Sequence, residues 1–160
     1  MSLFESSLFS WRETYFLFLQ ANDRPTAEEA VKVLAPLKGR IVIENTQDDD
    51  EGKLEAMTIL APSDSAGIDV TYVTGEELDE QKAELKKELR GAKLPADEQA
   101  KLERILAADA RFDFFHFQQL SDDPREDEEF LDPGALLSIM SQLAKLCHGT
   151  AYDPQSSSLM

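Results

Sequence analysis

The segment at 111–120, RFDFFHFQQL, constrains the fold most, because it holds four of the nine phenylalanines within six residues. Neighbouring side chains of an extended strand point to opposite faces, so Phe112, Phe114 and His116 share one face and the other rings lie opposite. Aromatic rings on both faces need cover, since an exposed aromatic face favours aggregation. The segment therefore predicts an inner strand, covered by helices on one face and by further chain or a partner on the other.

Turn residues, capping signatures and apolar periodicity divide the rest of the chain into strands and helices. Strands are expected at 14–20, 40–44, 55–61, 68–73, 111–120 and 150–153, and helices at 26–37, 74–90, 95–108 and 133–148. Thr26 with Glu29 and Thr74 with Glu77 have the spacing of capping boxes at the start of two helices.

The order of these elements predicts an α+β fold. The two ends of the chain share the order strand, capped helix, glycine, short strand, and a strand meander and a helical hairpin lie between them. We expect a layered antiparallel or mixed sheet with helices on one face, ferredoxin-like or related, in which two βαβ units flank the meander and the hairpin.

The length and the cysteine content narrow the class of protein. A chain of 160 residues suits a single domain, expected at 1–153 and followed by a mobile polar tail at 154–160. The one cysteine, Cys147, cannot form an internal disulfide, and its place on an apolar helix face predicts a core residue. The first ten residues lack the basic start of a secretory signal, and no apolar run approaches the ~20 residues of a membrane span. These features predict a cytoplasmic protein.

The charge of the chain bears on its partners. Asp and Glu number 32 against 16 Lys and Arg, which gives a formal charge of -16. Such a field repels phosphate backbones and anionic lipids, which argues against direct binding to nucleic acid or to a membrane surface, and it attracts basic proteins. A solvated acidic surface that serves only solubility explains the same charge without any partner.

Two acidic loops are the predicted binding surface. Their acids are Asp48, Asp49, Asp50 and Glu51 in the first loop and Asp122, Asp123, Glu126, Asp127, Glu128 and Glu129 in the second. The first loop does not place its acids and glycine as a calcium-binding EF-hand requires, so no metal site is predicted there. The preferred hypothesis is a non-enzymatic inhibitor, immunity-type or adaptor protein whose acidic loops contact a basic partner.

Catalytic signatures are absent from the sequence. It contains no G-x-G-x-x-G, P-loop, H-E-x-x-H, C-x-x-C or G-x-S-x-G pattern, and two histidines with one cysteine are too few for a typical zinc centre. Neither catalytic residues nor a cofactor are therefore predicted.

The alternative hypothesis concerns His116, because it interrupts the aromatic strand. A small-molecule-binding protein or an unfamiliar enzyme would have a cleft beside 112–120 and would use His116 with Tyr15 or Tyr72. A core histidine with a hydrogen-bond partner explains the same residue without a ligand. A homodimer built through the aromatic sheet face is compatible with either hypothesis.

Overall fold

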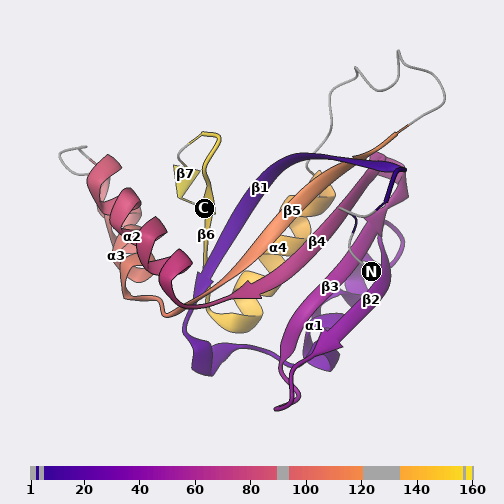
Figure 1. The fold of residues 1–160 in the computed structure, drawn as a ribbon, viewed down its shortest axis with the longest axis horizontal. Coiled ribbons are helices and arrows are strands. Elements are labelled where there is room, and N and C mark those ends of the chain that lie inside the picture. Colours follow the sequence, from indigo (N-terminus) through magenta and orange to yellow (C-terminus); the bar gives the residue numbers. More distant parts are fainter. Residues whose placement is uncertain (1–2, 4–5, 90–93, 121–133, 157, 160) are drawn as a thin grey trace.

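The computed structural model describes residues 3, 6–89, 94–120, 134–156 and 158–159. This part of the chain contains seven strands and four α-helices (Figure 1). The strands are β1 (Phe9–Leu19), β2 (Val42–Asp48), β3 (Leu54–Ala61), β4 (Ala66–Val73), β5 (Ala110–Gln119), β6 (Thr150–Asp153) and β7 (Ser158–Leu159). The helices are α1 (Ala27–Leu34), α2 (Glu76–Glu88), α3 (Ala96–Ala107) and α4 (Gly134–Cys147).

All seven strands form one antiparallel sheet in the order β2-β3-β4-β5-β1-β6-β7. The α+β class and the antiparallel sheet are thus confirmed. The connections β1–α1–β2 and β5–α4–β6 each join strands that run in the same direction, but other strands lie between them. Strand β1 lies between β5 and β6, and β5, β4 and β3 lie between β1 and β2. The complete ferredoxin-like topology stays a prediction.

Helices α1 and α4 cover one face of the sheet, behind the strands in Figure 1. The main core lies between them and the sheet. It takes Leu17 from β1, Ile68 from β4, Phe112 and Phe114 from β5 and Leu136 from α4, all almost fully buried. The alternation predicted for the aromatic strand is confirmed, since its even-numbered rings share this face.

The opposite face, here called the open face, is covered by the described residues only at its ends. At one end, the α2–α3 hairpin packs on Phe18 of β1 through Leu78, Leu85 and Ile105. Figure 1 shows this hairpin beside the β1–β6 end of the sheet, away from α1 and α4. The prediction that the helices lie on one face is therefore wrong. Because β1 carries large apolar side chains on both faces, a second layer is required to bury Phe18.

The N-terminal segment covers the other end of the open face. Leu3 is buried against Gly67 of β4, and its N–H donates to Asp69 Oδ2 at 2.8 Å. A Cβ at position 67 would lie 2.7 Å from a methyl carbon of Leu3, so glycine allows this close approach. The middle of the open face lies between the α2–α3 hairpin and the N-terminal segment.

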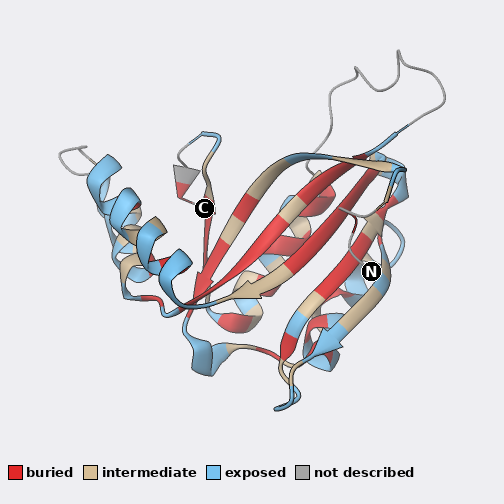
Figure 2. Cartoon of the chain, viewed as in Figure 1, coloured by how far each residue is buried: buried red, intermediate tan, exposed pale blue. Residues whose placement is uncertain are grey.

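Several boundaries differ from those predicted. β1 begins at Phe9 rather than at 14, and α1 ends at Leu34, where a 3-10 turn containing Pro36 takes over. The chain after 153, predicted to be a mobile tail, carries β7, and Leu159 is buried beside β6. Figure 2 shows the resulting burial, with β3, β4 and β5 mostly buried and the outer side of α2 exposed. Of the helices in the described ranges, none has the length and apolar character needed to cross a bilayer.

Candidate functional site

Two rows of side chains cross the open face at right angles to the strands. The antiparallel register aligns one residue from each of five strands in each row. The first row consists of Phe16, Asp113, Thr71, Ala56 and Gln47, and the second of Thr14, Phe115, Asp69, Thr58 and Asn45. Helix α2 stands beside the β1–β5 end of both rows, and β2 forms the other end.

A cavity of about 370 Å³, here called the acidic groove, lies between α2 and the open face. Its wall on α2 consists of Glu77, Glu80 and Glu84, whose spacing of three and four residues puts them on one helix face. Its floor includes the half-buried rings of Phe16 and Phe115. The groove thus combines exposed carboxylates with aromatic surface.

Polar contacts hold α2 in place above the sheet. Buried Arg111 donates to Gln81 Oε1 on α2 and forms a two-pronged pair with Asp113, with N···O distances of 2.5 and 3.1 Å. Lys82 Nζ donates to the carbonyl oxygen of Ala108 at 2.8 Å. The Arg111 guanidinium also lies 4.8 Å from the centre of the Phe16 ring. Arg111 therefore links α2 to the sheet, and its positive charge is already balanced by the Asp113 carboxylate.

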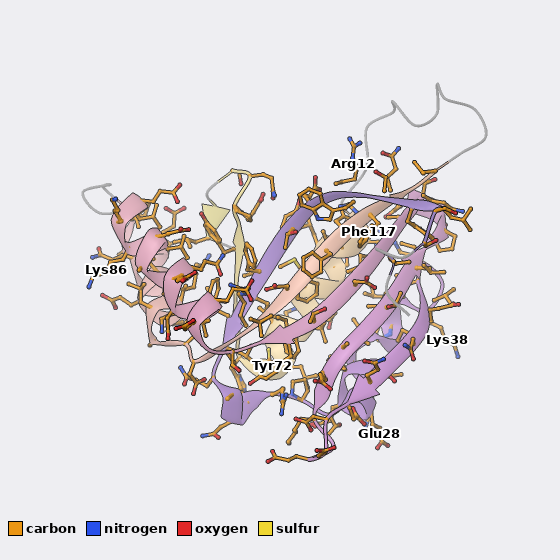
Figure 3. All side chains as sticks on the ribbon, in the orientation of Figure 1. Arg12, Glu28, Lys38, Tyr72, Lys86 and Phe117 are labelled. Carbon is orange, nitrogen blue, oxygen red and sulfur yellow. The ribbon has the colours of Figure 1, made fainter. Side chains whose placement is uncertain are left out.

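The electrostatics of the groove favour a cation. Four carboxylates and one guanidinium line it, which leaves an excess of three negative charges when all are ionised. Burial raises the pKa of Asp113, the Arg111 hydrogen bond and charge lower it, and Glu77 raises it further, so the net shift is upward. In Figure 3, Lys86 lies on the side of α2 that points away from the sheet, so its charge does not face the groove.

A second cavity, here called the polar cavity, lies at the β2 end of the same two rows. It measures about 160 Å³ and is lined by Asn45, Gln47, Thr58, Asp69 and Thr71 among others. Thr58 Oγ1 donates to Asp69 Oδ1 at 2.7 Å. The amide side chains of Asn45 and Gln47 make no hydrogen bond to any residue that the structure describes.

The structure seals His116 inside the core. Its side chain has 0% exposure and lies on the face covered by α1 and α4. Nδ1 lies 3.1 Å from Glu13 Oε1, and the Tyr15 hydroxyl donates to the same oxygen at 3.4 Å. Burial and the Glu13 carboxylate raise the pKa of Tyr15 to about 12. His116 and Tyr15 are thus brought together through Glu13, but without an opening for a ligand.

Tyr72 lies apart from this pair. It packs against Phe112, with ring centres 5.4 Å apart, and the Arg24 guanidinium lies 4.1 Å from the centre of its ring. On β4, His116 aligns with Ile68, which lies four residues before Tyr72 in the sequence. The groove beside the aromatic strand therefore lies on the open face and uses Phe115, not His116.

Half of the first acidic loop is engaged in internal structure. Asp48 Oδ1 accepts from the N–H of Ala27 at the start of α1, and Asp49 accepts from the N–H groups of Glu51 and Lys53 and from Arg24. These backbone donors, with Lys53 first, lower the pKa of Asp49. Asp50 and Glu51 are exposed. The predicted binding acids Asp122, Asp123, Glu126, Asp127, Glu128 and Glu129 lie outside the described residues.

Sequence reasoning missed the acidic groove. The helix predicted at 74–90 has few apolar residues, and acids on such a helix are typical of a solvated face that binds nothing. The three glutamates did carry a signal, since their spacing places them on one face. No part of the sequence, however, indicates that this face meets Phe16 and Phe115.

The described residues offer no group of three or more His, Cys, Asp or Glu side chains placed to hold a metal ion. The groups that line the groove and the polar cavity include carboxylates, amides, hydroxyls and aromatic rings. Comparison of the chain with protein-family models gave no match, and comparisons with curated proteins and with solved structures gave none either.

Proposed function

We propose that this protein is a non-enzymatic binding protein that recognises a basic segment of a partner protein in the acidic groove. The observation that carries the proposal is the combination of an acidic wall on α2 with half-buried phenylalanine rings on the sheet. An inhibitor or an adaptor would use such a site without chemistry of its own.

The recognition would use two interactions at once. A Lys or Arg side chain in the groove would lie near Glu77, Glu80 and Glu84. Its charged head would reach the Phe115 ring, because the Arg111 guanidinium already lies over the Phe16 ring. Partial removal from water strengthens both interactions. The overall charge of -16 adds long-range attraction, which speeds association at low ionic strength.

The groove replaces the acidic loops as the proposed contact. Asp48 and Asp49 are committed to the start of α1 and to their own loop, so they offer less to a partner than exposed Asp50 and Glu51. The proposed partner class, a basic protein, is the one that the charge of the sequence favours.

The test compares two variants of equal charge. The groove variant is Glu77→Gln, Glu80→Gln and Glu84→Gln, and the control variant is Asp79→Asn, Asp97→Asn and Glu103→Gln, whose residues are exposed and do not line the groove. The probe is a three-residue peptide, acetylated and amidated, with one Arg, measured by calorimetry at low salt. We expect the groove variant to bind roughly tenfold more weakly, or about 1.4 kcal/mol, and the control to bind nearly as the parent does.

Two outcomes would overturn the proposal. If both variants lost the same affinity, bulk charge rather than the groove would explain binding. If the parent protein bound no Arg or Lys peptide at low salt, the groove would not be a cation site. Thermal unfolding of each variant checks that the fold is intact.

A further inference from the structure

We infer that the partner segment is an extended peptide that crosses the open face from the acidic groove to the polar cavity. The inference rests on the proposed function and adds to it the shape, length and composition of the bound segment.

The two cavities lie on one continuous surface. Asp113, at the floor of the groove, aligns with Thr71 on β4, and Thr71 aligns with Ala56 on β3 and then with Gln47 on β2. Thr71 and Gln47 line the polar cavity. Ala56 and Thr71 of the first row are small and half-buried, both line the polar cavity, and Thr71 lies directly beside Asp113 of the groove. The rows therefore form a low path across the sheet.

The length of the path fits a short extended segment. Neighbouring strands lie ~4.8 Å apart, so the four steps from β1 to β2 span ~19 Å. An extended chain advances ~3.3 Å per residue, which gives about six residues for the crossing. Alternate side chains would point to the sheet, so about three of them would touch the rows.

The two ends of the path favour different groups. The groove, with its excess negative charge, takes a Lys or Arg side chain. The polar cavity is lined by amide, hydroxyl and carboxylate groups among others, and the amides of Asn45 and Gln47 offer donors and acceptors that suit main-chain groups or a polar side chain. We therefore assign a segment with one basic end and a polar remainder.

The chain itself already forms a hydrogen bond between a backbone N–H group and a side chain on this face. The N–H of Leu3 donates to Asp69 Oδ2, and Asp69 belongs to the second row. A side chain of the rows thus already binds the backbone of a segment that lies on the sheet. This contact is at the Gly67 end, so the first row, with Ala56 and Gln47, is the expected track of the partner.

The experiment separates the crossing path from the groove alone. Two seven-residue peptides of Ser and Gly each carry one Arg, at the N-terminal end in one peptide and at the C-terminal end in the other. The three-residue Arg peptide is the reference. In the parent protein, we expect one long peptide to bind about tenfold more tightly than the short one. Asn45→Ala with Gln47→Ala should remove this gain, whereas Asn22→Ala with Gln99→Ala, which removes two exposed amides away from the path, should keep it.

A second variant tests the path without removing a hydrogen bond. Ala56→Phe places a ring in the polar cavity, which Ala56 lines, and it should abolish the gain from peptide length while leaving the short peptide unaffected. Thermal unfolding checks each variant. If length gave no gain, or if the gain survived both Asn45→Ala with Gln47→Ala and Ala56→Phe, the crossing path would be wrong and the groove would stand. If the groove variant left short-peptide binding unchanged, the proposed function itself would fail.

Discussion

His116 lies in the core with its two ring nitrogens in different surroundings. Nδ1 faces Glu13, which also accepts from Tyr15, while Nε2 has no hydrogen-bond partner among the described residues. A buried polar atom without a partner costs free energy. The contact between Nδ1 and Glu13 is therefore the hydrogen bond that offsets part of this cost for the buried ring. The alternation of residues 112–117 predicts which side chains share the His116 face. It does not predict which face the helices cover, because both faces are aromatic.

The Tyr15 hydroxyl gives this cluster a measurable pH dependence. Its pKa is raised to about 12, mainly by burial, against the ordinary value of 10.0. Between these values the unfolded chain has lost the proton and the folded protein keeps it, so the free energy of unfolding falls as pH rises. We expect denaturant titrations above about pH 10 to show a steeper loss in the parent than in Tyr15→Phe. Parallel pH profiles for the two proteins would contradict this expectation.

Cys147 is predicted to be nearly unreactive in the folded protein. Its side chain is buried on α4, and burial raises the pKa of the thiol to about 11. Both the low thiolate fraction and the lack of access slow attack on a disulfide reagent. We expect slow modification under native conditions and fast modification in denaturant. Native modification as fast as that of free cysteine would mean that α4 does not cover the thiol as described.

The α2 helix is held by polar contacts as well as by its apolar surface. Only Leu78 and Leu85 of this helix are buried, and contacts from Arg111 to Gln81 and from Lys82 to Ala108 fix its distance from the sheet. A thin apolar stripe is enough to predict a helix with one buried edge. Its docking partner is not predictable from the stripe, because Leu78 and Leu85 would suit many apolar surfaces.

Helix starts give a clean comparison of two predicted capping boxes. At α1, Thr26 Oγ1 accepts from the N–H of Glu29 and Glu29 Oε1 accepts from the N–H of Thr26, as predicted. At α2, Gly75 takes the N-cap position and no side chain caps the helix, so the capping box predicted from Thr74 is wrong. The sequence spacing alone does not reveal the backbone angles at Gly75, where φ is 96°.

We therefore expect Thr26→Ala and Thr74→Ala to differ in stability. Loss of the Thr26 cap should lower the free energy of unfolding by about 1 kcal/mol. Thr74 is exposed and caps nothing, so its replacement should change the stability by less than about 0.5 kcal/mol. Urea titrations of the two variants measure both values. Equal losses would mean that the α1 cap contributes no special stability.

At the scale of the whole molecule, the candidate site is a product of strand register. The acidic groove joins residues from β1, α2 and β5, which are far apart in the sequence. Most helices and strands could be predicted from capping, periodicity and turn residues, and so could the excess of acids. The strand order could not, because local patterns do not specify which strands pair. The spacing of the three glutamates on α2 therefore indicates an acidic helix face but not that this face lies beside β1 and β5.

The net charge predicts opposite effects of salt on stability and on binding. A charge of -16 destabilises the compact state through self-repulsion, and salt screens this repulsion. Raising the ionic strength from about 10 mM to about 150 mM shortens the screening length from ~30 Å to ~8 Å. We expect Tm to rise over this range, while affinity for the Arg peptide falls. A Tm that fell with salt would mean that attractive charge pairs outweigh the repulsion.

The central place of β1 has a consequence for biosynthesis. β1 ends at residue 19, and its partner β5 begins at residue 110. At a synthesis rate of about 5–20 residues per second, β1 leaves the ribosome on the order of 5 to 20 seconds before β5 is available. The β2–β3 and β3–β4 pairs are local and can form in that interval, although β4 also waits for β5. The nascent chain thus carries an aromatic strand without its β5 partner during this interval, and a chain interrupted before residue 110 would never provide that partner.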